Sequence, residues 1–137
     1  MVTLPRVKGT RRGVRGGRTN KANFSSNNDQ WTIYQSNIRG YISKAFSFGG
    51  IVAGLQPSVI VLNETHLKHD QKLKIPGYNS FNRNRKKKCM GGIATSIKNV
   101  DAMHVLKVTE GENENEFLIT QHCQFVVPIN IINVYGQ

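Results

Sequence analysis

Acidic residues are scarce in this sequence, in which eight Asp and Glu stand against 19 Lys and Arg and the net charge is +11. The basic excess is concentrated at the start, because residues 1–30 hold seven of the basic residues and a single acidic one. A chain with this charge favours partners that carry phosphate, either nucleic acid or an anionic membrane surface. No apolar run approaches the roughly 20 residues that span a bilayer, which leaves nucleic acid as the favoured partner.

Cysteine and secretion signals are also sparse. The two cysteines, Cys89 and Cys123, are far apart in the sequence and are most simply free thiols in a reducing compartment. No apolar signal segment follows Met1, so we do not expect secretion. We expect an intracellular protein, located in the nucleus if its basic start acts as an address.

Large apolar residues are few in residues 1–30, which are rich in Gly, Arg, Asn and Ser. Such a segment cannot bury enough surface to offset its ordering entropy, so we predict a disordered basic arm. Its Arg-Gly alternation either binds nucleic acid loosely or is a solvated tail. Residues 31–137 then form one domain, long enough for a hydrophobic core.

The ordered part begins with a strand, a helix and a second strand. Residues 31–35 and 59–62 have the aromatic and β-branched content of strands, and the second is a continuous apolar run typical of a strand buried on both faces. Between them, apolar residues recur at spacings of four and three, which predicts a helix ended by Pro57. The apolar stripe consists of Tyr41, Ala45, Phe48, Val52 and Leu55.

The later sequence has the pattern of β-hairpins. Turn residues separate short segments that we predict as strands. The carboxylates from Glu110 to Glu116 lack the spacing of a calcium loop and are predicted to be a solvated turn. His66 and His69 have the spacing of a helical metal pair, but they stand in polar loop sequence and are expected to be solvated. His104 and His122 are expected in core or surface positions. The predicted strands are 78–82, 93–97, 103–108, 116–120, 125–127 and 129–135.

Two features of this part can carry chemistry. Glu64 directly follows the buried strand, where a carboxylate either points into water or is held by a bound metal ion. A basic hairpin tip follows later and either grips a phosphate backbone or only keeps the protein soluble. Its basic residues are Arg83, Arg85, Lys86, Lys87 and Lys88.

Three short stretches agree in order and spacing with one family. Residues 35–40 (QSNIRG), 62–67 (LNETHL) and 133–135 (NVY) resemble the first motifs of the endonuclease/exonuclease/phosphatase superfamily. The linking segments 75–78 (IPGY) and 91–94 (GGIA) are similar to those of endonuclease domains of non-LTR retrotransposons. The resemblance covers residues 31–137.

This resemblance implies an α/β (α+β) fold, the N-terminal half of a four-layer α/β/β/α sandwich with mostly antiparallel strands and one helix between the first two strands. It implies a Mg²⁺-dependent (or Mn²⁺-dependent) phosphodiesterase acting on DNA. Glu64 would bind the metal, Asn37 would help position the metal or the phosphate, and Tyr135 would hydrogen-bond a phosphate oxygen. Arg39 and the basic tip would contact the nucleic acid.

The sequence also departs from the family pattern. Ser36 stands where the family often has Trp, Arg39 where it often has Asn, and Gly136-Gln137 where Ala-Pro is common. The later Gly-Asp-x-Asn and Ser-Asp-His segments do not occur in the sequence. We therefore expect an incomplete nuclease domain that does not cleave efficiently alone. The alternative is a basic nucleic-acid-binding module without chemistry, and phosphatases of the same superfamily share the early motifs.

Overall fold

The computed structural model describes residues 1–5, 30–86, 90–111 and 116–136. Lys87, Lys88, Cys89 and most of the basic arm lie outside the described residues. Among the described residues, neither helix has the length and apolarity needed to cross a lipid bilayer. The elements are β1 (Val2–Pro5), β2 (Gln30–Asn37), α1 (Tyr41–Leu55), β3 (Val59–Asn63), β4 (Tyr78–Arg83), β5 (Ile93–Lys98), α2 (Asn99–Ala102), β6 (Val105–Glu110), β7 (Glu116–His122) and β8 (Ile129–Tyr135).

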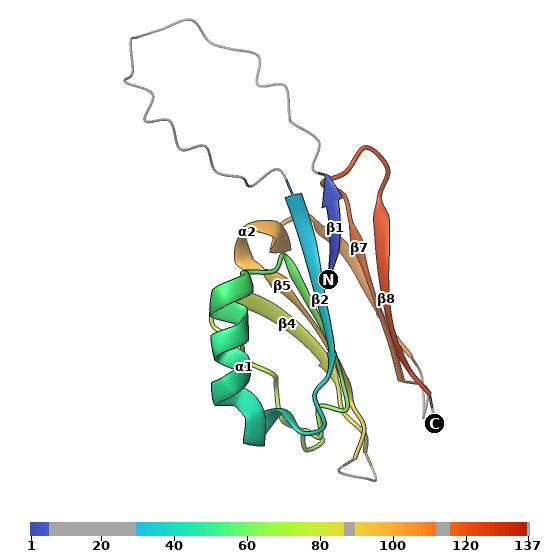
Figure 1. Cartoon of the computed structure of the whole chain (residues 1–137). Helices are drawn as coiled ribbons and strands as arrows, with labels where there is room; N and C mark the ends of the chain where they lie inside the picture. The colour runs from blue at the N-terminus through green and yellow to red at the C-terminus, as the bar shows by residue number, and fades with distance from the viewer. Residues whose placement is uncertain (6–29, 87–89, 112–115, 137) are drawn as a thin grey trace, which may run out of the picture.

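Two sheets and one long helix form three layers, with α1 on one side of a five-stranded sheet and a three-stranded sheet on the other (Figure 1). The five strands run in the order β1-β2-β3-β5-β4, and the three in the order β6-β7-β8. Among the described strands, only β2 and β3 pair in parallel, because α1 carries the chain back between them. The predicted fold class, a mixed α/β fold of mostly antiparallel strands with one crossover helix, is confirmed.

One part of the core lies between α1 and the large sheet. Phe48 and Val52 of the predicted apolar stripe are buried there against Ile60 and Leu62 of β3, whereas Leu55 at the helix end is exposed. All five residues of β3 are buried, as its continuous apolar run predicted. Burial on both faces fixes the register of β3 and therefore the place where the strand ends.

The other part of the core lies between the two sheets. Trp31 of β2 is fully buried there with Val59, and its ring meets His122 at 5.2 Å and Phe125 at 5.0 Å between centroids, both in edge contacts. His122 is fully buried, which is one of the two positions expected for it. Burial lowers the pKa of His122 to about 4, so its ring is neutral at pH 7.

Three sequence expectations differ from the structure. Residues 2–5, assigned by composition to the arm, form β1 and pair with β2, with Leu4 packing on the inter-sheet core. The strand predicted at 125–127 is wrong: these residues form a bend, because Phe125 turns inward onto Trp31 while Val126 stays 81% exposed. The short helix α2 was not predicted, since four residues leave no periodic signal.

Candidate functional site

The site begins where the parallel strands end. Asn37, the last residue of β2, is the register partner of Asn63, the last residue of β3. Glu64 comes next in the chain, and the carboxyl ends of parallel strands meet at one edge of a sheet. The side chains of Asn37 and Glu64 therefore start from neighbouring positions although they are far apart in the sequence.

The backbone around Glu64 is held in an unusual conformation. Glu64 has φ 54° and His66 has φ 52°, in the left-handed region that non-glycine residues seldom adopt, and Arg39 facing them has φ 47°. Hydrogen bonds fix this loop from both sides: its carbonyls at 64 and 65 accept the amides of Gly40 and Tyr41, and its amides at 65 and 66 donate to the carbonyls of Gly92 and Gly91. Left-handed residues of this kind cluster at functional sites, where the surrounding structure enforces them.

Two asparagines bring the end of β8 to this loop. The amide of Asn133, which is 2% exposed, donates to the carbonyls of Leu62 at 3.2 Å and Ala94 at 2.9 Å, across the gap between the sheets. In return, the amide of Asn63 donates to the carbonyl of Val134 at 3.1 Å. These cross-sheet bonds hold the last residues of β8 beside β3, so the ring of Tyr135 lies next to Glu64.

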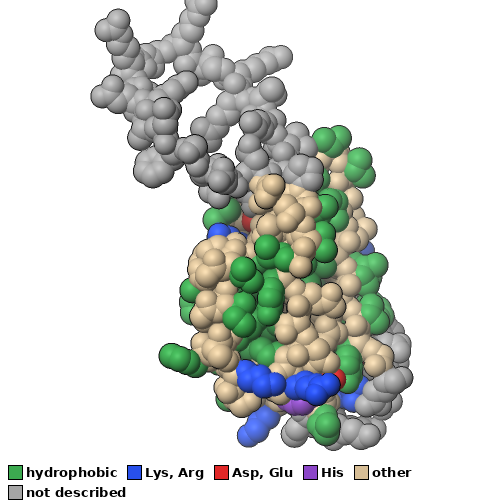
Figure 2. Space-filling model, in the orientation of Figure 1, with side chains coloured by type: hydrophobic (Ala, Val, Ile, Leu, Met, Phe, Trp, Pro, Cys, Tyr) green, Lys and Arg blue, Asp and Glu red, His purple; other side chains and the backbone are tan. Residues whose placement is uncertain are grey.

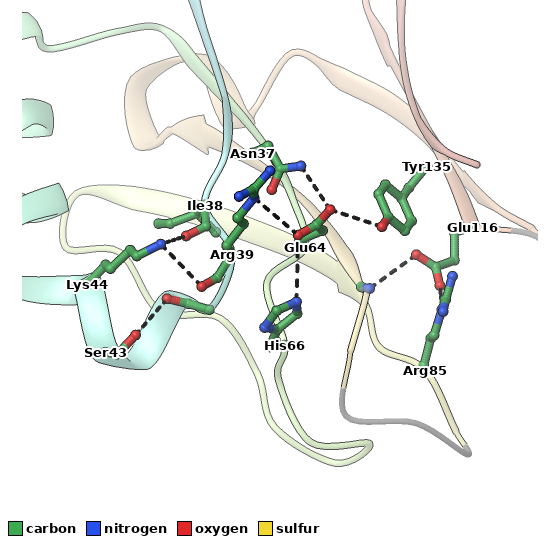
Figure 3. Close-up of polar contacts among 12 residues, drawn as sticks. Asn37, Ile38, Arg39, Ser43, Lys44, Glu64, His66, Arg85, Glu116 and Tyr135 are labelled. Carbon is green, nitrogen blue, oxygen red and sulfur yellow. Dashed lines mark hydrogen bonds and ion pairs between the residues drawn. The ribbon is translucent and has the colours of Figure 1, made fainter. Parts of the chain in front are cut away.

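The Glu64 carboxylate is the centre of the arrangement (Figure 3). Its Oε1 accepts hydrogen bonds from Asn37 Nδ2 at 2.9 Å and from the Tyr135 hydroxyl at 3.0 Å. Its Oε2 lies 3.9 Å from both Arg39 Nε and His66 Nε2. The structure thus brings together the three residues that the sequence motifs selected, Asn37, Glu64 and Tyr135.

The hydrogen bonds decide the ionisation of the site. Those from Asn37 and Tyr135 lower the pKa of Glu64 below its ordinary value, so the carboxylate is charged at neutral pH. The same bond to Glu64 raises the pKa of Tyr135, so the phenol keeps its proton. The result is an ionised oxygen ligand flanked by two neutral hydrogen-bond donors.

This donor set fits a small hard cation. Both hydrogen bonds go to Oε1, whereas Oε2 accepts no hydrogen bond from the described residues and lies 3.9 Å from both Arg39 Nε and His66 Nε2, so Oε2 is the atom open to a metal ion. The residues that the structure describes contain no cluster of three or more His, Cys, Asp and Glu that could enclose a metal. Mg²⁺ commonly binds through one or two carboxylates and keeps several waters, and a single carboxylate with a nearby amide meets that requirement.

Basic side chains line the rim of the site. Arg39 is 77% exposed and its guanidinium can turn away from Glu64. The ammonium of Lys44, on the first turns of α1, donates to the carbonyls of Ile38 and Arg39 at 2.6 and 3.2 Å, which places its charge over the β2–α1 connection. Figure 2 shows Lys and Arg side chains gathered beside a His and an acidic side chain at this end of the molecule.

The described residues of the predicted basic tip differ in whether their side chains face solvent or point into the protein. Lys86 is exposed and Arg83 is half-buried. Arg85 points inward and forms an ion pair with Glu116. Glu116 begins β7, as the predicted strand 116–120 had it, but the expectation that its carboxylate is solvated like those of the preceding turn is wrong: its side chain is 4% exposed and its Oε2 also accepts the amide of Gly92 at 3.1 Å.

Two further neighbours of the site lie inside the sequence motifs but were assigned no role there: His66 in residues 62–67 and Asn133 in residues 133–135. His66 was expected in a solvated loop, yet it is half-buried and lies beside Glu64. Its position depends on the left-handed backbone of the loop, which no local pattern signals. The sequence around Asn133 does not indicate its burial, because its apolar neighbours Ile132 and Val134 point to the opposite face of the strand, where each is 60% exposed.

Solved structures share this fold. The chain matches the AP endonuclease LMAP from Leishmania major with a TM-score of 0.64 and 19% identity, over 77% of this chain and 40% of that one. It matches a 3′ phosphatase, NExo, from Neisseria, solved with a product DNA hairpin, with a TM-score of 0.59, 19% identity and coverage of 77% and 41%. For an AP endonuclease from Archaeoglobus fulgidus, the TM-score is 0.57, the identity 17% and the coverage 77% and 40%.

These likenesses define the fold as part of the endonuclease/exonuclease/phosphatase fold. The chain spans about two fifths of the length of the structures it matches. No protein-family model and no curated protein matches the sequence.

Proposed function

We propose that this chain carries one part of a metal-dependent phosphodiesterase site that acts on DNA, of the kind found in endonuclease domains of non-LTR retrotransposons. The observation that carries the proposal is the Glu64 carboxylate, which is ionised, fixed by Asn37 and Tyr135 through Oε1, and open at Oε2. The retroelement assignment rests on the sequence motifs around residues 35–40, 62–67, 75–78 and 91–94.

Each residue has a distinct task in this proposal. Glu64 would hold Mg²⁺ through Oε2, and the bound ion would supply charge stabilisation for the phosphoryl oxygens. Asn37 and Tyr135 keep the carboxylate oriented, and the Tyr135 hydroxyl can redirect its proton to a phosphate oxygen once a cation compensates Glu64. Arg39 and Lys44 place positive charge where a DNA backbone would approach.

The proposal includes weak or absent cleavage by this chain alone. Hydrolysis also needs a group that activates and orients water, together with further charge stabilisation opposite the leaving group. In the superfamily the sequence resembles, the Gly-Asp-x-Asn and Ser-Asp-His segments serve these tasks, and this sequence contains neither. The expected activity of the isolated chain is therefore cation-assisted binding of phosphodiesters without turnover.

A binding assay with a short labelled DNA duplex tests the proposal. We expect Mg²⁺, compared with EDTA, to increase the affinity of the wild-type chain about fivefold or more, and Glu64→Gln to abolish that increase. Glu110→Gln is the matched control, because it removes one exposed carboxylate and changes the net charge equally. An equal Mg²⁺ response in Glu64→Gln and Glu110→Gln would refute a metal site at Glu64.

Plasmid nicking in Mg²⁺ tests the second part. We expect the wild-type chain to nick no faster than Glu64→Gln. Robust nicking by the wild type that Glu64→Gln abolishes would show a complete catalytic site and would overturn the proposed lack of turnover.

The second candidate is a basic DNA-binding module without a metal. Exposed cations favour it, such as Arg39 at the site and Lys86 on the basic hairpin, because such charges bind phosphate backbones without further chemistry. This candidate predicts binding that weakens steeply with salt and is the same in Mg²⁺ and EDTA at matched ionic strength.

A further inference from the structure

The side chain of Arg85 points from the basic hairpin toward the candidate site and is held there by two contacts. Its side chain is 19% exposed, and its Nε is paired with Glu116 Oε1. Its guanidinium carbon lies 5.6 Å from the centre of the Tyr135 ring, in cation–π geometry. Figure 3 shows Arg85 and Glu116 on one side of Tyr135, with Glu64 on the other.

Gly91 leaves the room that Arg85 needs, and Gly92 holds its carboxylate partner. A Cβ on Gly91 would lie 2.6 Å from Arg85 Nε, closer than atoms can approach, and Gly91 has a positive φ of 95°. The neighbouring Gly92 donates its amide to Glu116 Oε2 at 3.1 Å. The backbone at Gly91 therefore packs closely against the guanidinium of Arg85, and the amide of Gly92 fixes the Glu116 carboxylate that pairs with it.

We infer that Arg85 is a positioning residue that holds the Tyr135 ring against Glu64, and that Glu116 anchors Arg85 for this purpose. The inference rests on the proposed function in one respect, the role of the Tyr135 hydroxyl in binding phosphate. It assigns Arg85 a role different from that of a backbone-gripping cation at the hairpin tip.

The position of Tyr135 explains why it needs support. Tyr135 is the last residue of β8 and only half-buried, while Ile132 and Val134, which precede it on the same strand, are each 60% exposed. One hydrogen bond at the hydroxyl fixes one end of the ring and leaves rotation about its side-chain bonds. A guanidinium carbon 5.6 Å from the ring centre restricts that rotation, and the ammonium group of a lysine lacks the planar face of a guanidinium.

Nuclear magnetic resonance of the metal-free, DNA-free protein tests the positioning directly. The Tyr135 ζ-carbon resonance, assigned with Tyr135→Phe, reports the environment and hydrogen bond of the phenol. We expect it to move in Arg85→Lys and in Arg85→Gln, and to stay in place in Lys86→Gln, which removes an exposed cation of the same hairpin.

Arg85→Lys keeps a cation opposite Glu116, so it is the variant expected to stay folded. Gly91→Ala is the complementary change, because it leaves every charge in place and displaces Arg85 by contact. An unchanged Tyr135 resonance in Arg85→Lys would overturn the inference, whether or not Arg85→Gln folds.

A double-mutant cycle on Mg²⁺-dependent DNA affinity tests the link to function. We expect Arg85→Lys to weaken binding about fivefold in the wild-type background and to have little effect in Tyr135→Phe. Lys86→Gln should weaken binding equally in both backgrounds. Equal effects of Arg85→Lys in both backgrounds would mean that Arg85 contacts DNA itself and would refute the inference.

The two arms separate the inference from the proposed function. A moved Tyr135 resonance with no Mg²⁺-dependent binding in the wild type would contradict the phosphodiesterase proposal and leave the positioning role supported.

Discussion

Asn133 should be the polar residue on which the joining of the two sheets most depends. Asn133→Ala removes two hydrogen bonds, to the carbonyls of Leu62 and Ala94, at a position that is 2% exposed. Each bond is worth about 1 kcal/mol net, and a buried carbonyl left without a partner costs about 1–3 kcal/mol. Leu62 and Ala94 are register partners in the large sheet, so their carbonyls are not left wholly without polar neighbours and the full penalty does not apply twice. We therefore expect the free energy of unfolding to fall by about 2–4 kcal/mol.

Urea unfolding at pH 7, followed by the fluorescence of the buried Trp31, measures this change. Asn130→Ala is the matched control, because Asn130 lies on the same strand with an exposed side chain, and its expected effect is within about 0.5 kcal/mol. A loss below about 1 kcal/mol for Asn133→Ala would show that the cross-sheet bonds do not hold β8 in place, and the position of Tyr135 would lose its explanation.

Three further changes have defined outcomes in the same assay. Gly92→Ala should destabilise by about 2 kcal/mol, because its φ is +85° and the new Cβ would lie 2.6 Å from Thr65 Oγ1; an effect near zero would contradict this contact. Gly50→Ala should stabilise by about 0.5–1 kcal/mol, since Gly50 lies inside α1 and the added Cβ would meet no atom within 4 Å; a loss of stability would contradict this. The pKa of His122 is about 4 in the folded protein and 6.5 in the unfolded chain, so the unfolded chain binds the proton more strongly. The free energy of unfolding should therefore fall by about 3 kcal/mol as the pH drops from 6.5 to 4. His122→Phe should flatten that part of the pH profile, and an unchanged profile would contradict the burial of a neutral ring.

The local sequence pattern was sufficient to predict a helix or strand wherever the burial of its residues follows from the periodicity of that one element. The apolar run at residues 59–62 predicted a strand covered on both faces, and the stripe through Phe48 and Val52 predicted a helix with one apolar face; both predictions are confirmed. The parallel pairing follows from these two facts, because a strand, a crossover helix and a strand return in the same direction.

Contacts between distant segments could not be predicted in the same way. Glu116 belongs to a run of carboxylates that looks solvated, and only Arg85, 31 residues away, and the amide of Gly92 explain its burial. His66 lies beside Glu64 because both residues have a left-handed backbone conformation, which the local sequence does not predict. At such positions the burial of a side chain is decided by its partner in the tertiary structure and not by the preference of the local sequence.

The candidate site shows the same division. The motifs selected Asn37, Glu64 and Tyr135, and the structure places the three within hydrogen-bonding distance. The support behind them, in Asn63, Asn133 and the Arg85–Glu116 pair, became visible only in three dimensions.

Direct titration of Mn²⁺, observed by electron paramagnetic resonance in the absence of DNA, tests the central claim most simply. The claim is that the carboxylate after β3 holds a divalent cation through its free oxygen. We expect one site on the wild-type chain and on Glu110→Gln, competed by Mg²⁺ and lost in Glu64→Gln. Identical Mn²⁺ binding by the wild type and Glu64→Gln, or none by either, would contradict the claim.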